Sequence, residues 1–159
     1  MKTIIKITAI LSWFNLVIGS ILVLGGIFMG LAAGGILNIL TLIILPSAIV
    51  LHSYAALQLK KSILHPDIPL SNQTPVGIRF IGYVALFFAF INIVYAINIF
   101  QHTQDFVQLV KLPPEAANIN VARLLRIATA FSLLYSASIV ANVIMNFRLL
   151  RWYIIDMTE

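Results

Sequence analysis

The residues of this chain that could take part in binding or catalysis are a few polar side chains within long apolar runs. His52 is the only side chain in residues 7–59 that changes charge near neutral pH, because this stretch has no Asp, Glu, Lys or Arg. At about 1.5 Å per helical residue, Asn15, His52 and Asn142 each lie about 9–14 Å from the basic residue that borders their apolar run. We expect these three side chains to form a buried polar cluster, together with Tyr83.

Two kinds of chemistry fit such a cluster. An ionisable side chain inside a membrane often marks a proton relay or a binding site, and His52 would be its centre. Alternatively, a neutral imidazole and amide side chains join helices by hydrogen bonds. The second interpretation is favoured, because the apolar runs contain no acidic residue that would couple to His52. The same two alternatives apply to a second polar group near the other ends of the runs, formed by Asn92, Tyr95, Asn98 and Ser132.

Several types of active site lack their residues in this sequence. No paired histidines stand beside a glutamate, as a membrane metalloprotease requires. His52, His65 and His102 lie in three separate segments, which argues against haem held by two histidines. The chain has no cysteine, so disulfides and thiolate metal sites are excluded. We therefore predict no catalytic residue, no metal site and no cofactor.

The composition indicates a membrane protein. Of the 159 residues, 61% are hydrophobic and 9% are charged, and the mean hydropathy is +1.03. Soluble domains are about 45–50% apolar and about 25% charged. The net charge of +5 comes from ten basic residues against five acidic ones. The basic residues border the apolar runs, a placement that suits lipid headgroups as partners and not nucleic acid.

The lengths of the apolar runs predict four crossings of the bilayer, since one crossing takes about 20 residues. The 53 residues from 7 to 59 are enough for two helices, with a break near Gly34 and Gly35. Prolines 66, 69 and 75 predict a loop before the third helix, and residues 105–112 show helical spacing typical of a short interfacial helix. We predict one all-α transmembrane domain over 1–159, an antiparallel four-helix bundle with helices at 7–31, 37–59, 78–102 and 123–147, an inner loop at 60–77 and an outer loop at 103–122.

Small residues at spacings of three and four mark the expected packing faces of the helices. On the first helix, Gly19, Gly26, Gly30 and Gly34 lie on one stripe, and the last three form two overlapping GxxxG patterns. Such patterns join two copies of a chain or two helices of one chain, and the second interpretation is favoured here. Pro46 removes a backbone hydrogen bond inside the second helix and is a candidate kink, which we interpret as a fixed bend.

The distribution of Lys and Arg predicts the orientation. With four crossings, the side that carries both termini and residues 60–79 has seven basic residues, whereas the opposite side has three. The richer side is expected to be cytoplasmic, so both ends lie inside the cell. The sequence favours a non-enzymatic accessory or interaction subunit that binds a second copy or another membrane protein. The alternative is a small-solute transporter or channel. Small size and short loops suggest the inner membrane of a bacterium.

Overall fold

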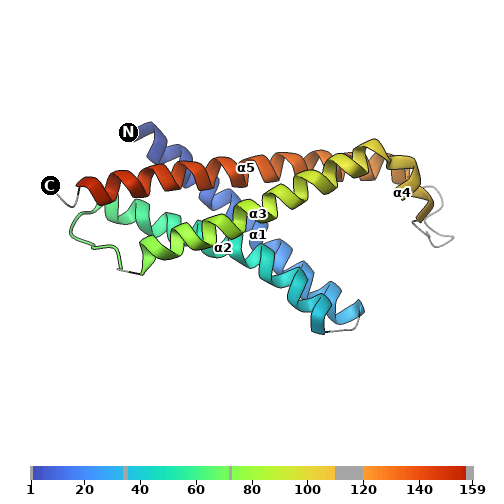
Figure 1. Ribbon diagram of the computed structural model, residues 1–159, viewed down its shortest axis with the longest axis horizontal. Helices are drawn as coiled ribbons and strands as arrows, with labels where there is room; N and C mark the ends of the chain where they lie inside the picture. The colour runs from blue at the N-terminus through green and yellow to red at the C-terminus, as the bar shows by residue number, and fades with distance from the viewer. Residues whose placement is uncertain (1, 34–35, 72, 110–119, 157–159) are drawn as a thin grey trace. The chain divides into compact units, whose positions relative to one another are not determined.

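The computed structural model is built from helices (Figure 1), and it describes residues 2–33, 36–71, 73–109 and 120–156. No strand occurs within these ranges. The elements in chain order are α1 (Lys2–Ala33), α2 (Ile36–Leu64), α3 (Thr74–Gln101), α4 (Thr103–Leu109) and α5 (Val121–Asp156).

Four of these helices are long and apolar enough to cross a membrane. Their apolar segments lie in α1, α2, α3 and α5 and have mean hydropathies of 2.2, 1.3, 2.2 and 1.8. The protein is therefore all-helical and membrane-embedded in character, as its composition predicts. Large apolar side chains on the outside of such helices face lipid, so their exposure carries little free-energy cost.

The helices extend beyond the apolar runs that predict them. α2 continues to Leu64 and α5 to Asp156, whereas the sequence predicts ends near residues 59 and 147. The apolar run measures only the part of a helix within hydrocarbon, about 30 Å, and Lys and Arg continue the helix into the headgroup region. α2 ends just before Pro66, since the residue ahead of a proline disfavours helical geometry.

The two helices that follow loops begin with recognisable signals. α3 starts at Thr74 and has Pro75 in its first turn, where the missing N–H of proline has no helical partner to lose. Before α5, the side-chain oxygen of Asn120 accepts a hydrogen bond from the backbone N–H of Arg123 at 3.0 Å, which caps the helix. The short helix expected in the outer loop is present as α4, which begins two residues earlier than the predicted 105.

The chain divides into two compact units by its internal contacts. Unit 1 comprises residues 1–88 and 138–159, and unit 2 comprises residues 89–137. In unit 1, α1 and α2 pack closely side by side along the chain's hairpin (Figure 1). An apolar core of unit 1 joins all four long helices and contains Ile5, Leu59, Ile78, Leu149 and Leu150. A single domain and an antiparallel bundle over the whole chain stay predictions.

Candidate functional site

The most specific polar feature of unit 1 is a hydrogen-bonded seam between α1 and α5. Ser12 Oγ donates to Asn142 Oδ1 at 3.0 Å. Ser138 Oγ donates to Asn15 Oδ1 at 2.9 Å, and Asn15 Nδ2 donates to the Ser138 carbonyl at 3.4 Å. Both helices therefore supply donors and acceptors. We call these residues, together with Asn146, the α1–α5 seam.

Within the seam, Asn142 is the central acceptor. Its Oδ1 accepts from Ser12 on α1 and also from Asn146 Nδ2, one turn along α5, at 2.9 Å. Ser12, Asn142 and Asn146 are each only 1% exposed, so the seam lies inside the protein and not at its surface. Interhelical hydrogen bonds of this kind contribute about 0.6 kcal/mol on average in a membrane protein, and up to about 1.7 kcal/mol. The seam thus fixes which faces of α1 and α5 meet.

His52 occupies a different environment in the same unit. It lies on α2, is 1% exposed, and neither ring nitrogen has a hydrogen-bond partner among the described residues. The backbone of Ile78 lies close enough to interact with the imidazole without reaching hydrogen-bond geometry. The ring of Phe147 on α5 has its centroid 6.3 Å from that of the imidazole, at an interplanar angle of 83°. This edge-on arrangement is one of the two that aromatic rings prefer.

Gly82 on α3 makes this contact between three helices possible. A Cβ atom at this position would lie 2.6 Å from Phe147 Cε1 and 3.1 Å from His52 Cε1. The first distance is well inside van der Waals contact, so any side chain would displace the Phe147 ring. The absence of a side chain at Gly82 therefore lets the α3 backbone rest directly on the two rings, as small residues do in membrane helix pairs.

Three of the four residues of the predicted inner cluster, Asn15, His52 and Asn142, are buried in unit 1, and the cluster itself stays a prediction. Asn15 and Asn142 are both buried and both belong to the seam, each through a serine of the other helix. His52 is buried beside Phe147, and no hydrogen bond joins it to Asn15 or Asn142. Tyr83 is 64% exposed, and its ring packs on Phe147 with centroids 5.3 Å apart.

The predicted outer group belongs to unit 2 and is less buried. Asn92 and Ser132 are half-buried, whereas Tyr95 and Asn98 are exposed. The best-defined side-chain contact nearby is the stack of Phe131 on Tyr135, at 6.4 Å and 5°.

The predicted packing residues lie mainly in buried positions. Gly19, Gly26 and Gly30 are buried on α1, and Gly34 lies outside the described residues. Pro46 is buried within the continuous helix α2. Gly25, the neighbour of Gly26, is exposed and has no atom within 4 Å of the position of a Cβ. The GxxxG stripe therefore faces protein, and the residue beside it does not.

Sequence reasoning overlooked two contributors to these sites, Ser138 and Phe147. Ser138 lies four residues before Asn142, and Asn146 lies four residues after it, so all three share one helix face. That spacing was the available signal for Ser138. Phe147 had none, because an apolar aromatic residue in an apolar helix is indistinguishable from its lipid-facing neighbours.

The site defines a class of protein more clearly than a reaction. It combines four candidate membrane spans with buried amide and hydroxyl contacts, and the described residues contain no group of three or more His, Cys, Asp or Glu side chains placed to hold a metal ion. Comparisons of the chain with protein family models, with curated proteins and with solved structures found no match. The class is therefore an all-helical membrane-embedded protein.

Proposed function

We propose that the protein is a non-enzymatic interaction subunit that binds another membrane protein through α3. The observation that carries this proposal is the row of exposed aromatic rings on that helix. In unit 1, α3 exposes Phe80, Tyr83 and Phe87 at 70%, 64% and 59%, and in unit 2 it exposes Phe90 at 64%. Of the four candidate spans, α3 has the smallest buried share of its apolar segment, 22%.

Lipid contact alone gives a weaker account of these rings. Aromatic residues that anchor a helix in the headgroup region are mainly Trp and Tyr, at the ends of the span. Phe87 and Phe90 lie instead at the centre of the 28-residue α3. Large, stiff aromatic side chains are enriched in protein interfaces, because they bury much surface for little lost side-chain entropy. A partner helix with small residues would pack over this row of rings.

Site-specific crosslinking in native membranes tests the proposal. A photoreactive phenylalanine analogue replaces Phe87 on α3, and the matched control carries it at Ile21 on α1, which is also 59% exposed. We expect a protein adduct from position 87 and none from position 21. Equal yields at both positions, or lipid adducts alone, would contradict the proposal. An adduct with a second copy of the chain would identify the partner as the protein itself.

We further propose that the four spans form an antiparallel bundle in a bacterial inner membrane, with both termini in the cytoplasm. The support is the excess of Lys and Arg on the side of the termini. The chain has no cysteine, so single cysteines report on topology without background. In intact cells, a membrane-impermeant thiol reagent should label Gln104→Cys but not Asp67→Cys. The reverse pattern would mean that the orientation is inverted.

A second candidate function, small-solute or proton transport, is favoured by one observation. Both ring nitrogens of His52 and the Nδ2 atom of Asn142 are buried without a hydrogen-bond partner among the described residues. Buried polar atoms of this kind often bind water, which is the medium of a proton path. Purified protein in vesicles with a pH gradient decides between the two functions. Proton flux that His52→Asn abolishes would support transport, and no flux above protein-free vesicles would support the interaction subunit.

A further inference from the structure

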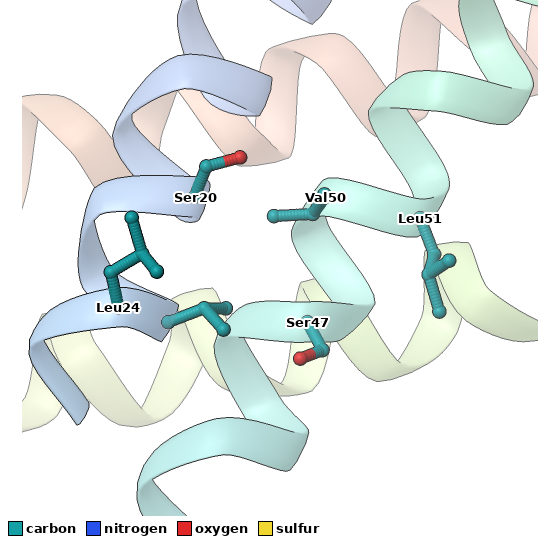
Figure 2. Close-up of a pocket in the computed structure, with 6 residues that line it drawn as sticks. Ser20, Leu24, Ser47, Val50 and Leu51 are labelled. Atoms are coloured by element: carbon teal, nitrogen blue, oxygen red, sulfur yellow. The ribbon is translucent and has the colours of Figure 1, made fainter. Parts of the chain in front are cut away.

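A groove opens between the two helices of the α1–α2 pair, within unit 1. It has a volume of about 470 Å³ and is lined by Ser20, Val23 and Leu24 from α1 and by Ser47, Val50 and Leu51 from α2. Figure 2 shows Ser20 and Val50 pointing toward each other from the facing helices. Both walls repeat the same spacing of i, i+3 and i+4, so each is a single helix face. The volume falls in the range of ligand sites, about 300–1,000 Å³.

The groove lies near the middle of both spans. Ser20 is 14 residues after Lys6 and 13 residues before the end of α1 at Ala33. Ser47 is 13 residues before Lys60 and 11 residues after the start of α2 at Ile36. At about 1.5 Å per residue, the groove is therefore about 17–21 Å from either end of the hairpin. The hydrocarbon core is about 30 Å thick, so this level corresponds to the region of the bilayer midplane.

The chemistry of the walls favours an apolar occupant. Four of the six lining side chains are aliphatic, and none is charged. The hydroxyl of Ser20 already donates to the Leu16 carbonyl at 2.7 Å, so it offers no free proton to a ligand. A polar ligand would find only the Ser20 and Ser47 hydroxyls as partners, and each of its groups left without a hydrogen bond would cost several kcal/mol. An apolar occupant loses nothing by leaving the surrounding hydrocarbon.

The length of the groove selects among apolar occupants. Its α1 wall runs only from Ser20 to Leu24, about 6 Å along the helix axis. A helix of a second copy is about 10–12 Å across with its side chains and would need a longer face. The terminal methylenes of a lipid chain are narrow and reach the bilayer midplane. We propose that this groove binds the methyl end of a phospholipid acyl chain.

Photoactivatable lipids test this assignment on the unaltered protein. The protein is reconstituted into phosphatidylcholine vesicles that contain a phosphatidylcholine with a diazirine near the terminal methyl of one chain. A second preparation carries the diazirine near the carbonyl end of the chain. The reference residue is Ile21, which is exposed at the same depth outside the groove. We expect the terminal probe to label the groove residues at least about threefold more than Ile21. The carbonyl-end probe should show no such excess. Equal labelling of the groove and Ile21 by the terminal probe would overturn the proposal. Labelling weaker than at Ile21 would also overturn it and would point to coverage by a second copy.

A groove-filling variant provides an independent test. Ser47→Leu adds a branched side chain to the α2 wall and should reduce groove labelling by the terminal probe to the level at Ile21. The control, Leu22→Phe, changes an exposed residue of α1 outside the groove and should leave the labelling excess unchanged. An excess that survives in a folded Ser47→Leu protein would overturn the proposal. If this variant does not fold, the comparison of the two probes on the unaltered protein still decides.

Discussion

The two halves of one α1 face associate with their surroundings by different means. In the N-terminal half, Ser12 and Asn15 are buried and hydrogen-bond to α5. In the C-terminal half, the same stripe continues as Gly19, Gly26 and Gly30, which are buried and have no side chain. Spacings of three, four and seven residues keep all five positions on one side of the helix. The first half thus depends on polar side chains, and the second depends on close approach of backbones.

The difference follows from the solvent around the helices. Lipid competes with apolar side chains as well as a neighbouring helix does, so burying them adds little to helix association. The interactions that still favour helix association are van der Waals contacts at short range and hydrogen bonds that lipid cannot replace. A glycine stripe gives contact without directional preference, whereas the α1–α5 seam requires each donor to meet its own acceptor. We infer that the glycine half contributes more to stability and the polar half more to the register of the helices.

The largest expected loss of stability is that of Gly26→Leu, which disrupts the packing of the glycine-containing C-terminal half of α1. Gly26 is buried, and a leucine there would force the packed backbones apart. We expect a loss of about 3 kcal/mol in the free energy of unfolding, at the upper end of overpacking costs. Gly30→Leu should act in the same way. Thermal or denaturant unfolding in detergent measures this loss.

The neighbouring glycine is the control for that prediction. Gly25 is exposed with open space around its Cβ position, so Gly25→Leu should leave stability nearly unchanged or raise it slightly through helix propensity. Similar losses for Gly25→Leu and Gly26→Leu would mean that general disturbance of α1, and not close packing, determines the effect.

A smaller loss is expected for Gly82→Ala, which tests close packing outside α1. The new methyl would lie 2.6 Å from Phe147 Cε1. Because the contacted atoms are at the end of a half-buried ring that can shift, we expect a cost of about 2 kcal/mol or less. Phe147→Leu in the same protein should recover part of that loss. Absence of any recovery would show that the cost comes from the backbone of α3 and not from the ring.

These contacts also show how far the sequence alone was informative. The four helical spans and the buried stripe of Gly19, Gly26 and Gly30 follow from hydropathy and from spacing, because both are local properties of one helix. The pairing of Asn15 with Ser138 does not follow, since it depends on which helix faces which across more than a hundred residues. Each polar residue could be identified as needing a partner, but the partner itself required the structure.

The contact of His52 with Phe147 was inaccessible for a further reason. Depth along a helix, estimated from distance to Lys or Arg, placed His52, Asn15 and Asn142 at similar levels. Depth does not give the rotation of a helix about its axis, which decides whether residues at one level touch. Tyr83 illustrates the same limit, because it packs on Phe147 from the exposed side.

Substitutions in the α1–α5 seam, which contains the polar half of the stripe and its partners on α5, should lower stability less than those at the buried glycines. Asn142→Leu removes the acceptor of two bonds and leaves Ser12 Oγ and Asn146 Nδ2 to find others. We expect a loss of about 1–2 kcal/mol. A double-mutant cycle of Ser12→Ala with Asn142→Ala should give a coupling energy of about 0.6 kcal/mol, the average for such bonds in a membrane protein. A coupling energy near zero would show that the two residues are neighbours without mutual stabilisation.

The smallest effect is expected at His52, which belongs to neither half of the α1 stripe. Its ring nitrogens have no hydrogen-bond partner among the described residues, so the main contact that His52→Asn removes is the edge-on one with Phe147, and about 0.5 kcal/mol should be lost. His52→Leu is the sharper variant. Replacing a buried, unpartnered polar group by an apolar one is neutral or stabilising, because its burial costs free energy that no bond returns.

If both variants unfold at the same denaturant concentration as the unaltered protein, His52 fills space beside Phe147 and Gly82. A loss above about 2 kcal/mol for His52→Leu alone would mean that the imidazole is hydrogen-bonded in the membrane, since that is the cost of removing one member of a buried polar pair. His52 would then join the seam as a third polar contact between helices.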